Sequence, residues 1–211
     1  MNKMIKDILI LTGITVIAGL LLGFFYNFTR GPISAQQEKI KQEAYLRVFP
    51  EAASIETDAL LEEELASEHN YLIEAGYEQE RIDEVMIAKD ASGNVLGYVL
   101  TVTTKEGYAG DITISAGITK EGTITGLEIL SINETAGLGM MADTDEFKNQ
   151  FAGRTVAKFS YTKTGAAADY EIDALSGATI TTNAMVNAVD AGLAFFEAAR
   201  LNDQYGGGTN E

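Results

Sequence analysis

The sequence predicts an α+β fold: a largely antiparallel sheet with packed helices, preceded by one N-terminal transmembrane helix. Three observations support this prediction: a charge-free apolar run near the N-terminus, four strand-like segments in two successive hairpins, and helical spacing of apolar residues near the C-terminus. The chain has 211 residues, which is enough for one ordinary domain with a modest appendage.

The apolar run at residues 8–25 reads ILILTGITVIAGLLLGFF and contains no charge. Tyr26 and Phe28 extend it toward the ~20 residues that cross ~30 Å of hydrocarbon. A cleaved signal peptide is disfavoured, because NFTRGPISAQQ follows in place of a small-x-small cleavage site. A buried helix of a soluble core is the third interpretation. We predict that residues 1–28 form a transmembrane anchor in contact with membrane lipid.

The charge distribution indicates how the anchor is oriented. Residues 29–211 carry 13 basic and 30 acidic side chains, a net charge of −17, while Lys3 and Lys6 precede the apolar run. An anionic cytoplasmic leaflet would repel such a domain. We therefore expect a single-pass protein of the cell membrane with a cytoplasmic N-terminus and an extracytoplasmic domain. The same charge excludes nucleic acid as a partner.

Several kinds of active or metal site are excluded by composition. The chain has no cysteine and one histidine, His69, so it forms no disulfide, thiolate nucleophile, Cys-ligated cluster or multi-histidine metal cage. One histidine in an acidic stretch does not support a Ser-His-Asp constellation. The Asp143-x-Asp145 pair has Lys148 and Arg154 where a calcium loop needs Gly and Glu. We predict no metal site and no hydrolytic catalytic residue.

The segment at residues 29–84 is predicted to be a helical and acidic stalk or peripheral segment. The Gly31-Pro32 pair is expected to break the chain, and Ser34 to cap a new helix through QQEKIKQEAYLRVF. Residues 51–84 contain twelve acids and one base. This composition is typical of a solvated, partly helical surface.

Strand signals dominate the next part of the chain. Segments 83–90 and 93–104 flank one turn, and segments 111–118 and 122–130 flank another. Two hairpins in succession predict a largely antiparallel sheet.

A short helix is expected at residues 145–151, and a longer one from Thr182 to Leu201, whose apolar residues recur at helical spacing. We predict one domain at residues 85–202 and a disordered tail at 203–211.

The strongest local signal is the segment from Asp173 to Thr181, which reads DALSGATIT and precedes the last helix. Hydroxyl groups and small residues at a helix entrance favour a phosphate group, because backbone N–H groups there are free. Alternatively, Thr181 or Thr182 merely caps the helix and Ser-Gly makes the turn. The nearby Gly137-x-Gly139 is not a dinucleotide fingerprint, since no ribose-binding acid follows about twenty residues later.

This segment resembles the flavinylation motif D-x-x-S/T-G-A-T/S-x-S/T of FMN-binding domains. The matching residues are Asp173, Ser176, Gly177, Ala178, Thr179 and Thr181. The resemblance implies that the 85–202 domain binds FMN and that Thr179 carries it covalently through a phosphoester bond.

Two further stretches resemble the same family. The segment ETAGLG is similar to the family's E-T-P-G-L-G loop with Ala136 replacing proline, and the segment GYAG at residues 107–110 is similar to G-Y-G-G with Ala109 replacing glycine. The cofactor-binding residues that these stretches add are Glu134, Thr135, Gly137, Leu138, Gly139 and Tyr108.

The anchor and the three motifs together resemble the G subunit of Rnf-type ion-translocating ferredoxin:NAD oxidoreductases, related to the C subunit of Na-translocating NADH:quinone reductases. This resemblance implies an electron-transfer subunit of a translocating complex that does not catalyse the overall reaction alone. The implied partners are other subunits and a Mg-dependent flavin transferase that donates FMN from FAD. Two alternatives are an extracytoplasmic FMN-bearing reductase module for a small-molecule acceptor and a non-flavin, membrane-tethered binding or structural domain.

Overall fold

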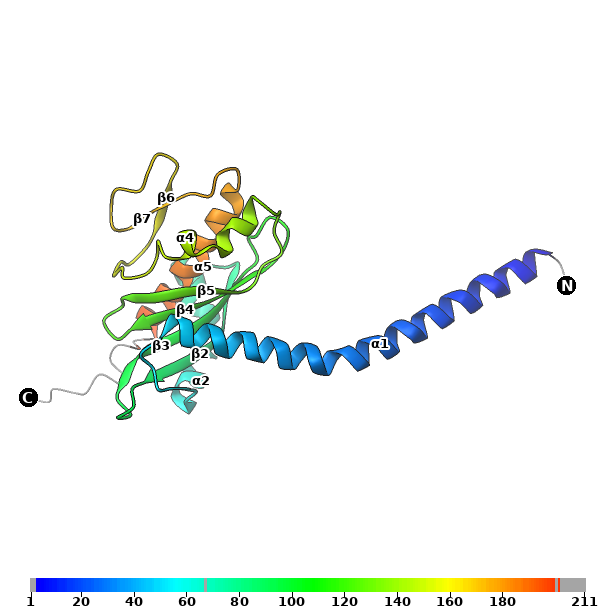
Figure 1. Cartoon of the computed structure of the whole chain (residues 1–211), viewed down its shortest axis with the longest axis horizontal. Helices are drawn as coiled ribbons and strands as arrows, with labels where there is room; N and C mark the ends of the chain where they lie inside the picture. Colours follow the sequence, from blue (N-terminus) through cyan, green and yellow to red (C-terminus); the bar gives the residue numbers. More distant parts are fainter. Residues whose placement is uncertain (1–2, 67, 200, 202–211) are drawn as a thin grey trace, which may run out of the picture. The chain divides into compact units, whose positions relative to one another are not determined.

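The computed structural model describes residues 3–66, 68–199 and 201. The chain divides between Lys41 and Gln42 into two compact units. Figure 1 shows the helices and strands in their order along the chain. The predicted tail at 203–211 lies outside the described residues. The α+β fold with a largely antiparallel sheet is confirmed.

The first helix, α1 (Lys3–Val48), contains the predicted membrane span. Among the described residues it is the helix with the length and composition to cross a membrane. Its apolar side chains are exposed, Leu20 by 70% and Leu22 by 72%, so the interpretation as a buried core helix is wrong. So much exposed apolar surface needs lipid or an apolar partner to cover it.

The expected break at Gly31-Pro32 is wrong, because α1 runs through both residues. Proline in a helix lacks one N–H group, and the helix continues on both sides of it. Ser34 does not cap a new helix: its hydroxyl donates to the Gly31 carbonyl, 2.9 Å away. This bond satisfies the Ser34 side chain inside a continuous helix.

The segment at 29–84 contains helices and also supplies core residues. It contains β1 (Ser54–Glu56), α2 (Ala59–Leu65) and α3 (Glu68–Ala75). Leu61 and Leu72 are fully buried in the main core. Apolar residues spaced between acids produce helices with one buried side, which a composition count does not reveal. The expected boundary at residue 84 falls inside strand β2, which begins at Glu80.

The central sheet has the strand order β1-β2-β3-β4-β5, with every neighbouring pair antiparallel. Both predicted hairpins are present. The strands after β1 are β2 (Glu80–Lys89), β3 (Val95–Thr104), β4 (Ile112–Thr119) and β5 (Ile124–Ser131).

One face of this sheet is covered by the long helix α5 (Thr179–Ala198). Side chains of β3 and β4 alternate between the two faces, and Leu100, Val102 and Ile114 enter the main core together with Phe195 and Phe196. Between β5 and α5 the chain forms the 3-10 helix η1 (Gly139–Asp143), α4 (Asp145–Lys148), β6 (Ser160–Thr162) and β7 (Glu171–Asp173). The predicted helix at 145–151 is therefore present but shorter.

The opposite face of the sheet receives the end of α1 in a trough of three glycines. A Cβ atom on Gly117 would lie 2.8 Å from the Val48 carbonyl oxygen, and one on Gly97 would lie 2.8 Å from the Phe49 ring. A Cβ atom on Gly126 would lie 3.1 Å from Val48 Cα. The glycines thus let the chain at Val48–Phe49 lie directly on the sheet backbone. Thr125 adds a hydrogen bond from its hydroxyl to the Val48 carbonyl.

Gly117→Ala should destabilise this packing, because the new methyl group has no space against the Val48 backbone. We expect a loss of about 1–3 kcal/mol in the free energy of unfolding, the usual cost of overpacking. Urea unfolding of the full chain in detergent measures it. Ser92→Ala, in an exposed turn, is the control, and equal stability of the two variants would contradict the trough.

A buried carboxyl group lies in the middle of α5. Asp190 is 1% exposed. Its Oδ1 accepts a hydrogen bond from the Phe159 N–H at 2.8 Å, and the Tyr77 hydroxyl also interacts with the carboxyl group. Burial raises the pKa of Asp190 to about 7, although the Phe159 N–H and the charge of Lys158 act in the opposite direction.

This raised pKa makes stability fall as pH rises. The folded chain holds the Asp190 proton up to about pH 7, whereas an unfolded aspartate loses it near pH 4. The free energy of unfolding that Asp190 contributes at about pH 4 is therefore lost by about pH 8. This loss is at most about 4 kcal/mol. Asp190→Asn should gain stability relative to the wild type between pH 5 and pH 8 in urea unfolding. The exposed Asp169→Asn is the control, and a constant difference across pH would refute the prediction.

Candidate functional site

The predicted anion site lies at the first turn of α5. The helix begins at Thr179, three residues before the predicted start, and its N-cap is Ala178, which offers no side-chain cap. The N–H groups of Thr179, Ile180 and Thr181 precede the first intrahelical hydrogen bond and point out of the helix entrance. The alternative in which Thr181 or Thr182 caps the helix is wrong, because both lie inside it. The run of β-branched residues hid this start, since such residues favour strands.

Thr182 has a different role, which the motif did not indicate. Its buried hydroxyl accepts a hydrogen bond from the Leu175 N–H at 3.1 Å and donates one to the Ala178 carbonyl at 2.9 Å. One side chain therefore closes the turn that precedes Thr179. Within that turn Gly177 has φ +73°, a conformation that favours glycine.

The turn, the helix entrance and the two other motif segments form one cavity of about 430 Å³. A volume of this size is typical of a small-molecule site. Thr179 is half-buried and Thr181 is buried. The lining residues are Tyr108, Glu134, Thr135, Leu138, Gly139, Gly177, Ala178, Thr179, Ile180 and Thr181. Nine of the twelve residues that the sequence predicts for cofactor binding thus meet here.

Glu134 joins two of the cavity segments. Its Oε1 accepts hydrogen bonds from the backbone N–H groups of Tyr108 at 2.7 Å and Ala109 at 3.4 Å. These bonds hold the 107–110 turn against the 134–139 loop. Glu134 therefore positions the turn that carries the exposed Tyr108 side chain.

Gly139 allows the 134–139 loop to approach the first turn of α5. A Cβ atom at this position would lie 2.7 Å from Thr181 Oγ1 and 2.8 Å from Glu134 Oε2. Any larger residue would push the loop away from the helix entrance.

A second carboxylate, which the sequence did not indicate, fastens the 107–110 turn to α5. The Oε2 atom of Glu106 accepts hydrogen bonds from the side-chain amides of Asn187 at 2.6 Å and Asn183 at 3.4 Å. The two asparagines are four residues apart and lie on one face of the helix. The predicted helix already contains both asparagines, but Glu106 is distant from them in the sequence and becomes their neighbour only on folding.

The other three predicted residues, Gly137, Asp173 and Ser176, line a neighbouring cavity of about 310 Å³. Asp173 Oδ1 accepts a hydrogen bond from the Ala166 N–H at 2.7 Å. The Gln150 side chain holds the Asp173 backbone, accepting from its N–H at 2.6 Å and donating to its carbonyl at 3.3 Å. Asp173 therefore anchors the loop between β6 and β7 beside the larger cavity.

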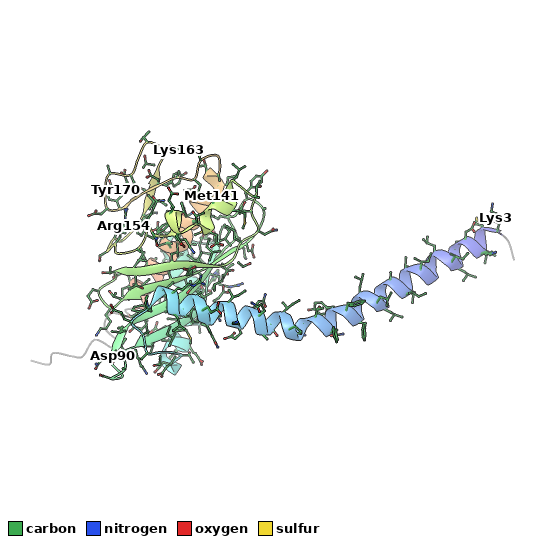
Figure 2. All side chains as sticks on the ribbon, viewed as in Figure 1. Lys3, Asp90, Met141, Arg154, Lys163 and Tyr170 are labelled. Atoms are coloured by element: carbon green, nitrogen blue, oxygen red, sulfur yellow. The ribbon has the colours of Figure 1, made fainter. Side chains whose placement is uncertain are left out.

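The loop beyond Gly139 is supported by a buried lysine. Lys148 Nζ lies 2.8 Å from Glu128 Oε2 and 3.6 Å from Asp143 Oδ1. Burial disfavours its charge, but Glu128 and the neighbouring aspartates outweigh this and raise the pKa of Lys148. Figure 2 shows Met141, which follows Gly139 in η1, at the end of the domain away from the Asp90 turn.

The chain has similarity to known proteins along most of its length. Residues 107–194 match the FMN-binding domain family. The G subunit of the ion-translocating oxidoreductase complex of Methanosarcina acetivorans is 32% identical over 93% of this chain and 96% of its own. The G subunit of the Na(+)-translocating ferredoxin:NAD(+) oxidoreductase complex of Acetobacterium woodii is 33% identical over 90% of this chain and 89% of its own.

Among solved structures, Shewanella oneidensis NqrC aligns with 55% of this chain and 60% of its own, with a TM-score of 0.47 and 21% identity.

In the described residues no group of three or more histidine or acidic side chains is placed to hold a metal ion.

Thr182→Val should destabilise the turn before α5, because the Leu175 N–H then loses its buried acceptor. We expect a cost of about 1–3 kcal/mol, measured by urea unfolding of the full chain. Thr182→Ser keeps the hydroxyl and should restore most of the stability. Equal losses in the two variants would show that the methyl group and not the hydroxyl matters.

Proposed function

The chain belongs to the family of G subunits of ion-translocating oxidoreductase complexes, and from this membership we propose that it carries FMN in phosphoester linkage to Thr179 and relays electrons through it. Its match to the FMN-binding domain family and its apolar N-terminal helix identify a membrane flavoprotein subunit. The hypothesis of a non-flavin domain loses its support. Bound FMN supplies one- and two-electron redox chemistry.

The position of Thr179 supports the proposed covalent linkage. Its half-buried side chain lies at an uncapped helix entrance that opens into the 430 Å³ cavity. Free N–H groups and the helix dipole favour a phosphate there. The residues present therefore fit the phosphate end of FMN. Leu138, Gly139 and Gly177 line the same cavity, and we propose that the Leu138 side chain covers part of the flavin ring.

We infer that the attachment is made by a flavin transferase that uses FAD. The Thr179 hydroxyl loses its proton, its oxygen bonds to the FMN phosphorus, and AMP leaves. Asp173 and Ser176 would then act beside the cavity, since both line the neighbouring one. Other subunits of the complex and membrane lipid complete the set of partners.

Thr179→Val should abolish covalent flavin while leaving the fold intact, because it keeps the side-chain shape and removes the oxygen nucleophile. The full chain is co-expressed with a flavin transferase and run on a denaturing gel, where covalent flavin gives a fluorescent band. Thr179→Ser, which keeps a hydroxyl, should retain fluorescence. Fluorescence that survives in the valine variant would overturn the assignment.

We propose that the N-terminus is cytoplasmic and the FMN domain extracytoplasmic. The net charge of −17 on residues 29–211 supports this orientation, because it disfavours contact with an anionic cytoplasmic leaflet. Alkaline phosphatase, which folds only outside the cytoplasm, should be active when fused after Gly208. Green fluorescent protein fused at the same position is the complementary control. Its fluorescence would show that the C-terminus is cytoplasmic and would contradict the proposed topology.

A further inference from the structure

We propose that the mouth of the cavity is a docking surface for a redox protein whose contact face carries lysine and arginine around an apolar centre. This inference deepens the proposed function, since it names the kind of partner that meets the flavin site. It stands on the distribution of exposed apolar and charged side chains around the cavity.

Large apolar side chains are exposed around this cavity. Tyr108 is 69% exposed and Ile180 is 52% exposed, while Leu138 and Met141 are each 42% exposed. The first three line the cavity, and Met141 lines its neighbour. These four residues, the apolar centre, come from three segments that the Glu134 and Glu106 hydrogen bonds hold together. Exposed apolar residues gathered on a rigid surface mark an interaction site.

The exposed charges around the apolar centre are mostly negative. In the segments that form the site, residues 105–111, 134–146 and 173–181, five acidic side chains are exposed and one basic side chain, Lys105, is exposed. The acids, which we call the acidic rim, are Asp111, Asp143, Asp145, Glu146 and Asp173. The lysine of α4, Lys148, does not add an exposed positive charge, because it is buried among Glu128, Asp143 and Asp145.

This pattern of apolar and acidic side chains indicates the surface charge of the partner. An apolar centre with a charged rim is the common arrangement of small, short-lived protein interfaces. A negative rim attracts a basic protein and speeds its association, and it repels both acidic proteins and anionic lipid. A second copy of this chain would bring two acidic rims together, so the charges also disfavour self-association through this surface.

The test measures binding and not electron transfer. Horse-heart cytochrome c, a small basic redox protein, is titrated by calorimetry into the full chain in neutral detergent. Both the flavin-loaded wild type and the flavin-free Thr179→Val variant are used. We expect binding to both, about tenfold weaker at 200 mM than at 20 mM NaCl. Hydrogen exchange should show protection of the backbone at residues 108 and 138–146.

A matched pair of variants separates the rim from net charge. Asp145→Asn with Glu146→Gln should weaken binding about three- to tenfold. Glu62→Gln with Glu63→Gln removes the same charge near the start of α2, outside the cavity lining, and should leave affinity within twofold of the wild type.

Equal weakening by the two pairs, or protection elsewhere on the domain, would overturn the proposal. Protection of residues 138–146 by a second copy of the chain, or by phosphatidylglycerol vesicles, without cytochrome c would also overturn it. If the wild-type chain, co-expressed with a flavin transferase, binds cytochrome c at the rim but acquires no covalent flavin, the proposed function is refuted and this surface stands.

Discussion

The cavity depends on the hydrogen bonds that two carboxylates make between segments far apart in the sequence. Glu134 accepts from the backbone of the 107–110 turn, and Glu106 accepts from two asparagines of α5. Each carboxylate replaces water around groups that would otherwise be unpaired, and hydrogen bonds to charged acceptors are stronger than neutral ones. Gly139 completes the closure, because a side chain there would collide with Glu134 and Thr181. The cavity is therefore a product of contacts between three segments and belongs to none of them alone.

The sheet that carries these segments is used on both faces. Its inner face holds α5, whose first turn opens into the cavity, and its outer face holds the end of α1 in the glycine trough. Strand alternation makes this possible, since Val99 and Leu100 are neighbours in β3 yet enter different clusters. The chain that leaves the apolar helix at Val48 thus enters the fold directly on the backbone of β4 and β5.

Sequence patterns predicted the parts of this fold that depend on local periodicity. The four long strands and the segment at 173–181 carry their information within about ten residues each, and the apolar span at 8–25 within eighteen. The continuation of α1 through Pro32 was missed, because the cost of one lost hydrogen bond is small beside a long helix. The early start of α5 was missed because β-branched residues conceal it. Glu106 and Thr182 were missed because their partners become neighbours only after folding.

The first turn of α5 differs from those of the shorter helices in a way that bears on the cofactor. Helices α2, α3 and α4 each have an acid in the first turn, where it interacts favourably with the helix dipole. The chain has 31 acidic residues, yet the first turn of α5 has none and its N-cap is alanine. A protein with this much negative charge repels a phosphate over most of its surface. Because the first turn of α5 has no carboxylate, a phosphate can take the position that an acidic side chain occupies in the shorter helices. A covalent bond to Thr179 would hold that phosphate in place against the negative charge of the surrounding domain.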